Sequence, residues 1–464
     1  MKLTAFYVST VVLGLLAIIG VMHVGTGWEG PAAVGATAAD PFAPLLSRLD
    51  SPLARLFLQI IVIIAAARLA GLVFRRMGLP AVVGEMTAGI LLGPSLFGLV
   101  APGLFAAIFP ADSLGTLRLL SQVGICLFMF AVGMDLDLAH LRNRARAVVA
   151  VSHASIVVPY AFGVGLALFL FQDYAGPSAS FTSFALFMGI SMCITAFPVL
   201  VRILQERGLS RTPLGQMAIA CAAVDDITAW SIMAFVVAIA GATGLGGAVV
   251  TLALAGLFVA AMLLVVRPLL PRLIGERALA AEEPQTGVLA LVVLLVTTGS
   301  LMTELIGIHA LFGAFLAGAV MPSVKGFRHR IGLRVESFSS VMLLPLFFAF
   351  TGLRTRMDLL GDTDGWLLCL VVVAVATAGK LGASAVAARL AGMELRQALQ
   401  VGALMNTRGL MELIALNIGY DMGILSPMIF TVLVMMAVIT TIMTGPLLTL
   451  FSRPARAPAA VRAR

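Results

Sequence analysis

Two adjacent aspartates, Asp225 and Asp226, lie near the middle of a long apolar segment. From Thr212 to Val266 the chain carries no other charged residue. A membrane-spanning helix needs about 20 apolar residues, so this segment predicts a helix with two carboxylates at mid-membrane. A carboxylate at that depth costs at least about 2.5 kcal/mol on insertion scales, and such acids usually mark ion or proton paths. The pair therefore limits the chain to folds that can use a charge inside a membrane.

The composition agrees with a membrane protein. The 464 residues are 61% hydrophobic and 11% charged, whereas soluble domains have roughly 25% charged residues. Only helices and closed barrels satisfy the backbone in lipid, and these runs are continuous rather than alternating, so the fold class is all-α polytopic. The four cysteines lie in apolar segments without metal-ligand spacing. We expect no disulfide, no resident metal, no cofactor and no nucleic-acid partner.

Apolar runs and breakers together predict about 13 core helices plus one extra N-terminal helix, each close to the length of a membrane span. The expected helices cover residues 5–24, 53–74, 81–99, 117–134, 147–171, 181–204, 213–241, 247–271, 286–305, 307–322, 338–353, 365–391, 398–418 and 426–450.

Charges in the loops predict the orientation. Basic residues follow the even-numbered runs, and acidic residues follow most odd-numbered runs. By the positive-inside rule, the even loops and both termini are cytoplasmic in a multi-pass protein of the cell (inner) membrane. The first run is ambiguous, since Lys2, an apolar stretch and Ala36-Thr37-Ala38 resemble a signal peptide. The small residues lie well beyond the apolar stretch, which favours a retained helix.

Two expected helices contain breakers at mid-depth. The helix 181–204 contains Thr195 and Pro198, and the helix 398–418 contains Asn406, Thr407, Arg408 and Gly409. Proline removes a backbone donor, and Thr195 could satisfy a group that the break frees. One such helix could be a simple kink. Two at corresponding positions favour inverted repeats with broken helices that cross at mid-membrane, as in many secondary transporters. We also place Thr195 with Asp225, Asp226 and Lys380 in the predicted ion and proton site.

This interpretation divides the chain into five parts. They are an extra N-terminal helix with a periplasmic loop (1–52), a first inverted repeat (53–242), a linker helix and loop (243–285), a second inverted repeat (286–450) and a short basic cytoplasmic tail (451–464). The first repeat contains the broken helix 181–204 and the Asp-Asp helix 213–241, and the second contains the broken helix 398–418.

Several motifs, in order along residues 53–450, resemble the monovalent cation/proton antiporter-2 family. They are GILLGPS at 89–95, ITAFPVL at 194–200, VDDITAW at 224–230 and GIHALFGAFLAG at 307–318. The segment NTRGLMELI at 406–414 resembles the plant cation/proton exchanger branch. The resemblance implies a homodimer whose protomers each have a dimerisation domain and a mobile core, and elevator-like exchange of Na⁺ or K⁺ for H⁺.

The resemblance also implies roles for individual residues. Asp225 and Asp226 match the acidic pair of electrogenic bacterial antiporters, and Asp226 looks like the essential carboxylate. Lys380, the only lysine in an expected span, matches the intramembrane lysine that pairs with the first aspartate. The plant relatives usually have Asn where this chain has Asp225, and many bacterial members have Pro where it has Thr407.

The remaining candidates follow from chemistry and position. Arg408 cannot give up its proton, so we interpret it as a structural residue between crossing helices, with Glu412 as its partner one turn later. Pro198, Asn406 and Thr407 are placed in the same structural group. Glu304 and His309 lie near the outer ends of their runs, where a vestibule or a pH sensor is an alternative to simple packing.

The leading prediction is an electrogenic secondary antiporter for Na⁺ or K⁺ and H⁺, and not an enzyme. A cation channel or uniporter on the same scaffold is the main alternative, but it would not need a titrating lysine such as Lys380. An intramembrane enzyme is a third class. A di-aspartate protease would place its acids on different helices, and a prenyl transferase would repeat the acidic motif; the chain shows neither pattern.

Overall fold

The computed structural model describes residues 51–135, 145–210, 212–241, 245–281, 283–322, 324, 326–361 and 363–452. Within these residues every regular element is a helix, apart from one isolated bridge between Ala175 and Leu425. Nine helices of the described part are long and apolar enough to cross a membrane. The all-α membrane fold is therefore confirmed. The expected first helix (5–24) and the basic tail from 453 onward lie outside the described residues.

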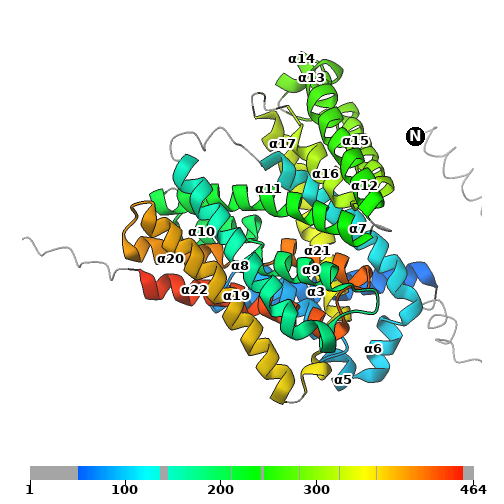
Figure 1. The fold of residues 1–464 in the computed structure, drawn as a ribbon. Helices are drawn as coiled ribbons and strands as arrows, with labels where there is room; N and C mark the ends of the chain where they lie inside the picture. The colour runs from blue at the N-terminus through cyan, green and yellow to red at the C-terminus, as the bar shows by residue number, and fades with distance from the viewer. Residues whose placement is uncertain are drawn as a thin grey trace, which may run out of the picture. The chain divides into compact units, whose positions relative to one another are not determined.

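Most expected helices form within a few residues of their predicted bounds (Figure 1). The unbroken spans are α3 (Pro52–Arg76), α7 (Leu114–Asp135), α8 (Ala145–Tyr174), α11 (Pro213–Gly241), α12 (Leu245–Ala261) with its continuations η3 (Met262–Val266) and α13 (Arg267–Ile274), α15 (Thr286–Ile306), α19 (Thr363–Leu390) and α22 (Pro427–Phe451). The shorter apolar helices are α4 (Ala81–Leu91), α16 (Ala310–Ala319) and α18 (Leu344–Arg354), which continues η4 (Ser339–Leu343).

The predicted separation of α15 and α16 is present. Gly307 ends α15 with φ +90°, a left-handed conformation that glycine adopts without steric cost. The end of one expected helix was wrong. The third expected helix ends at Leu91 instead of residue 99, shortly before Pro94, because proline disfavours helix in the residue before it. The short helices α5 (Phe97–Val100), α6 (Pro102–Ile108) and η1 (Ala111–Ser113) follow.

The helix α17 (Phe327–Phe338) was missed because the prediction relied on apolar runs. This helix carries Arg328, Arg330 and Arg334. Its apolar residues Phe327 and Ile331 are buried and lie one turn apart. A helix with one apolar stripe and a charged surface has low mean hydropathy, so a prediction from apolar runs assigns it to a loop.

Both helices that contain breakers are interrupted. The first consists of α9 (Phe181–Cys193) and α10 (Phe197–Glu206), and the second of α20 (Leu395–Met405) and α21 (Leu410–Asp421). Phe197 begins α10. Pro198 lies in the first turn of α10, where its missing N–H is one of the groups that a helix start leaves unpaired anyway.

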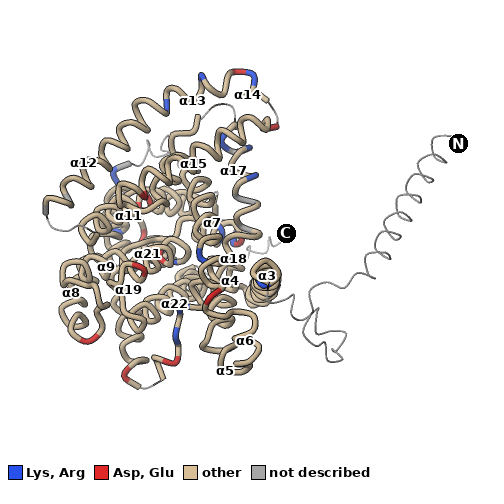
Figure 2. Tube along the Cα trace, turned by 90° about the vertical axis from the view of Figure 1, so that its right-hand side faces the viewer, with Lys and Arg blue, Asp and Glu red and all other residues tan. Residues whose placement is uncertain are grey.

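The helices pack most closely within two sets. We name α8–α11 and α19–α22 the crossing bundle, and α3–α7 and α15–α18 the companion bundle, since the closest helix pairs fall inside one set or the other. Helices α12–α14, with α14 at Glu276–Ala280, connect the two sets along the chain. In Figure 2 most of the trace is uncharged, and Lys, Arg, Asp and Glu concentrate at helix ends and connections.

Glycines allow close backbone contact inside each bundle. In the companion bundle, a Cβ on Gly352 of α18 would lie 1.9 Å from the Gly89 carbonyl oxygen of α4. In the crossing bundle, a Cβ on Gly163 of α8 would lie 2.4 Å from the Met188 carbonyl oxygen of α9. No larger side chain fits at these positions, so the helices can approach only because the residues are glycines.

Candidate functional site

The two interruptions meet inside the crossing bundle. The Ala196 amide donates to the Thr407 carbonyl at 2.9 Å, and Thr195 Oγ1 lies 3.2 Å from the Met405 carbonyl oxygen. A Cβ on Gly409 would lie 2.9 Å from Val199 Cγ2, so the second interruption packs directly against α10. Non-helical backbone is tolerated at membrane depth only where protein or a water-filled cavity surrounds it, and here each interruption satisfies part of the other.

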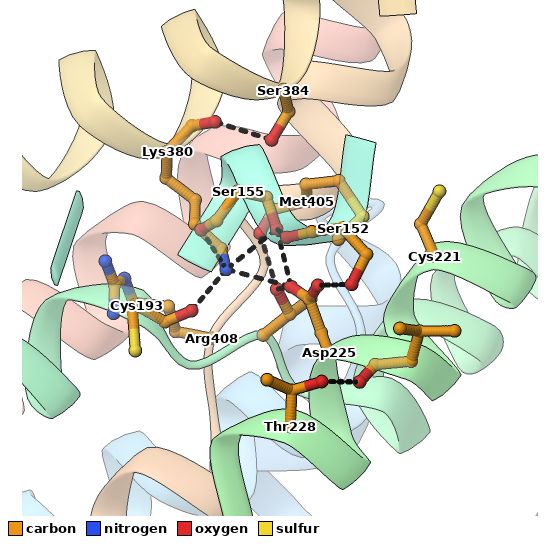
Figure 3. A network of polar contacts seen from close by, with 12 residues as sticks. Ser152, Ser155, Cys193, Cys221, Asp225, Thr228, Lys380, Ser384, Met405 and Arg408 are labelled. Atoms are coloured by element: carbon orange, nitrogen blue, oxygen red, sulfur yellow. Dashed lines mark hydrogen bonds and ion pairs between the residues drawn. The ribbon is translucent and has the colours of Figure 1, made fainter. Parts of the chain in front are cut away.

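Asp225 is fully buried and saturated with donors (Figure 3). Ser152 Oγ donates to Oδ1 at 2.6 Å, and Ser155 Oγ donates to Oδ2 at 2.7 Å. Thr195 Oγ1 also donates to Oδ2, at 2.7 Å. The carboxylate therefore joins α11 to α8 and to the first interruption.

Lys380 of α19 completes this network. Its Nζ lies 3.0 Å from Asp225 Oδ2, with both side chains fully buried. Nζ also donates to the Ser155 carbonyl at 2.9 Å and to the Cys193 carbonyl. All three hydrogens of the ammonium thus have acceptors, which is what a charge deep in a membrane protein requires.

Asp226 is buried like Asp225, but among the residues that the structure describes it lacks the hydrogen-bond donors that surround Asp225. Its side chain is 1% exposed, and neither carboxyl oxygen has a hydrogen-bond partner among the described residues. The backbone amide of Phe197, at the start of α10, lies near the carboxyl group without the geometry of a hydrogen bond. A helix N-terminus favours negative charge, so the half-helix α10 faces the carboxylate with its positive end.

Arg408 holds the end of the other half-helix. Its Nη1 and Nη2 donate to the carbonyls of Ser191 and Met192 at 2.7 and 2.6 Å, and Nη1 lies 3.1 Å from Glu412 Oε2. These carbonyls, together with that of Cys193, form the C-terminal end of α9. Two cations, Arg408 and Lys380, therefore neutralise the negative end of the α9 dipole.

The remaining polar residues of the second interruption differ from one another. Thr407 Oγ1 lies 3.3 Å from Thr444 Oγ1 of α22, whereas both amide atoms of buried Asn406 have no hydrogen-bond partner within the described part of the chain. Asn406 lies between Met405 and Thr407, whose carbonyls bind the first interruption. Asn406 is thus, like Asp226, a buried polar side chain without a hydrogen-bond partner among the described residues.

Glu304 and His309 lie elsewhere, where α15 meets α16. Glu304 Oε2 accepts from the Ala310 amide at 2.8 Å and so binds the start of α16. His309 is the residue before that helix, with φ +75°. Neither residue is part of the Asp225 network.

Sequence reasoning missed several members of the site. Ser152 and Ser155 were not singled out, although two serines three residues apart in an apolar run lie on one face of a helix. Thr441 was also missed; its Oγ1 accepts from the Arg408 amide at 3.0 Å and donates to the Arg408 carbonyl at 2.8 Å. The Cys193 carbonyl could not be found, because a carbonyl leaves no signal in the residue type.

Interrupted helices that cross at mid-membrane around buried charges define a membrane transporter of the secondary class. The family model described as "Sodium/hydrogen exchanger, transmembrane" matches residues 61–453, and the chain belongs to this family. The resemblance found in the motifs is thereby confirmed, and the protein is a secondary transporter and not an enzyme.

Individual relatives agree with the family. Na(+)/H(+) antiporter NhaS4 of Synechocystis sp. is 42% identical over 393 residues, which cover 84% of this chain and 95% of that protein. Cation/H(+) antiporter 17 of Arabidopsis thaliana is 36% identical over 410 residues, 88% of this chain but only 50% of the plant protein. The chain therefore spans half the length of this plant relative.

A solved structure shows the same fold. The sodium proton antiporter MjNhaP1 from Methanocaldococcus jannaschii superposes with a TM-score of 0.58, over 85% of this chain and 96% of that one, at 14% identity. At this identity the likeness concerns the arrangement of helices alone.

Proposed function

We propose that the protein exchanges a monovalent cation, Na⁺ or K⁺, for protons by alternating access, and that Asp226 is the carboxylate that binds them in turn. The observation that carries this proposal is the unpaired state of Asp226 beside a fully paired Asp225. A buried carboxylate without partners is costly, and a bound cation or a proton would each remove that cost. Carboxylate and carbonyl oxygens also suit a hard cation.

Asp225 and Lys380 supply the charge balance of the cycle. Two carboxylates and one ammonium lie within the same buried site, so binding of one cation can displace two protons, one from Asp226 and one from Lys380. The exchange is then electrogenic. One charge that crosses 100 mV gains or loses about 2.3 kcal/mol, so the flux should respond to an imposed membrane potential.

The two bundles suggest how the site changes sides. The crossing bundle carries the site and would move as the core, while the companion bundle would stay with the dimer interface of a homodimer. The segments 53–242 and 286–450, proposed as inverted repeats, contribute one interrupted helix each to the crossing, which supports the proposed division. By the positive-inside rule, the charge pattern favours a cytoplasmic side for the loops after α3, α10 and α22.

Proton movement in proteoliposomes tests the proposal. Wild-type protein should change the pH of the lumen when Na⁺ or K⁺ is added, and a potential imposed across the vesicle membrane should change the rate. Asp226→Asn should insert and remain folded but give no cation-dependent signal. Exchange that ignores the potential would refute the electrogenic cycle, and a normal signal from Asp226→Asn would refute the site.

A further inference from the structure

Ion pairs join the two bundles at one end of the interface between them, which we call the seam. Asp421, the last residue of α21 in the crossing bundle, lies 2.7 Å from Arg354 Nη1 of α18 and 3.0 Å from Arg118 Nη2 of α7. Both arginines belong to the companion bundle. A single carboxylate of one bundle therefore holds two helices of the other.

A second layer of contacts lies next to these pairs. Arg354 Nη1 also donates to Asn417 Oδ1 at 3.2 Å, and Asn417 Nδ2 donates to Thr351 Oγ1 at 2.9 Å. The Arg354 guanidinium lies 4.2 Å from the centroid of the Phe350 ring and 5.3 Å from that of Tyr420. Arg354 is thus oriented from both bundles, so its place opposite Asp421 is well determined.

A small cavity with a mixed apolar and polar lining lies beside the pairs. It has a volume of about 30 Å³ and is lined by side chains that include Ser121, Gln122, His309, Asn417 and Asp421. A cavity of more than roughly 10–15 Å³ can hold water when polar groups surround it. Ile414, Asn417, Ile418 and Asp421 lie on one face of α21, which runs from the crossing toward this end of the molecule.

The opposite end of the seam is open. A cavity of about 380 Å³ lies between Arg75 and Pro80 of the companion bundle and Ile203, Arg207 and Gly445 of the crossing bundle. On α22, Gly445 lies about 21 Å along the axis from Thr431, at 1.5 Å per residue. Thr431 Oγ1 accepts from the Arg356 amide at 3.1 Å, close to the end where Arg354 lies. The cavity and the ion pairs therefore mark opposite ends.

We propose that Asp421, Arg118 and Arg354, together called the outer gate, close the outer side of the transporter. The inference rests on the proposed alternating access and on the charge pattern that makes the Arg75 end cytoplasmic. The structure then has its seam open to the cytoplasm and closed outside, and outward opening requires Asp421 to leave both arginines.

The side chains of the outer gate are partly exposed to solvent, which suits ion pairs that break and form again. The side chains of Arg118, Arg354 and Asp421 are 43%, 17% and 22% exposed, whereas those of Lys380 and Asp225 are fully buried. Water can solvate a partly exposed charge as soon as its partner withdraws, so breaking the gate costs far less than separating a buried pair.

Thiol labelling from outside tests the gate. A cysteine placed in the cavity by Gln122→Cys would react with a membrane-impermeant maleimide in sealed, oriented vesicles, and the parent chain without this cysteine corrects for the natural thiols. Adding Asp421→Asn should raise the labelling rate several-fold, because the neutral amide cannot hold both arginines. Equal labelling rates with and without Asp421→Asn would overturn the proposal.

A matched control and a second variant keep the test decisive. Arg356 pairs with Asp358 at 2.6 Å, but both lie on one connecting segment, so Arg356→Gln should leave the labelling rate unchanged. If Asp421→Asn does not fold, Arg354→Gln carries the same test with the same expected rise. An equal rise in Arg356→Gln would refute a specific gate.

The labelling does not depend on exchange, so the two proposals fail separately. In the Asp226→Asn background, Asp421→Asn should still raise the labelling rate. Normal exchange by Asp226→Asn would refute the proposed ion site and leave a positive labelling result intact. Unchanged labelling in both gate variants would refute the gate while the ion site stands.

Discussion

The two sides of α11 at its centre carry the same acid in opposite settings. Asp225 and Asp226 point about 100° apart, as consecutive helical residues do. One carboxylate accepts from Ser152, Ser155, Thr195 and Lys380, and the other accepts from no described residue. Burial alone therefore does not distinguish a structural charge from a binding site. The number of satisfied lone pairs does.

Because the two carboxylates differ in their hydrogen bonds, substitutions near them should differ in their effect on the stability of the fold. The Asp225 network has already balanced the charge of Lys380, so removal of either partner leaves the other buried and unpaired. Asp226 has no such bonds to lose, and its charge remains available to a ligand. Substitutions on the Asp225 side should act on stability and on the charge moved in each cycle, and substitutions on the Asp226 side mainly on exchange itself.

The largest effect expected is the complete loss of exchange in Asp226→Asn. The amide keeps the shape of the side chain but removes the charge that would bind a cation. Because no hydrogen bond of Asp226 is lost, the melting temperature should stay close to that of the wild type or rise. Proton flux and thermal unfolding measured on the same preparation separate the two outcomes, and a strongly destabilised Asp226→Asn would contradict the comparison.

Lys380→Ala should have the largest effect on stability. It leaves Asp225 as an unpaired buried charge, which costs on the order of 3–5 kcal/mol. Asp225→Asn in the same chain should recover part of this loss, since it removes the unpaired charge. A double-mutant cycle from thermal unfolding gives the coupling energy. If the two losses simply add, Lys380 and Asp225 do not act as a pair.

Ser152→Ala should be milder. It removes one hydrogen bond to a charged group, a change of roughly 1.5–3 kcal/mol. Exchange should persist at a reduced level, because Asp225 keeps its other donors. Ser231→Ala is the matched control, since Ser231 lies on α11 but is exposed and bonds only within its own helix. Equal destabilisation of both variants would show that the Asp225 network contributes little.

Asn406→Ala should give the smallest change, a fall in apparent cation affinity of less than about tenfold, which corresponds to about 1.4 kcal/mol. The unpaired amide lies at the crossing and can offer an oxygen to the cation without loss of a bond in the protein. Asn417, whose amide is paired on both sides, is the control: Asn417→Ala should lower stability. An unchanged affinity in Asn406→Ala would limit the site to Asp226 and the backbone.

The sequence predicted the features that depend on local patterns. Apolar runs located the spans, and Thr195-to-Pro198 and Asn406-to-Gly409 located the interruptions, because breakers act on the backbone beside them. Contacts between residues far apart in the sequence were harder to predict. The motif resemblance pointed to Lys380 as a partner of the first aspartate, but no pattern indicated that Ser155, 225 positions away, lies beside it. Asp421 was only one of the acidic residues that follow odd-numbered runs, because ion pairs between distant helices depend on packing.

The glycine contacts described above also bear on mechanics. For every described glycine whose added Cβ would lie closer than 3 Å to a backbone atom, that atom belongs to the same bundle as the glycine. Each bundle is therefore interlocked internally at the level of the main chain, and none of these close glycine contacts joins the two bundles. In the alternating access proposed above, the crossing bundle could therefore move against the companion bundle without breaking any of these main-chain contacts.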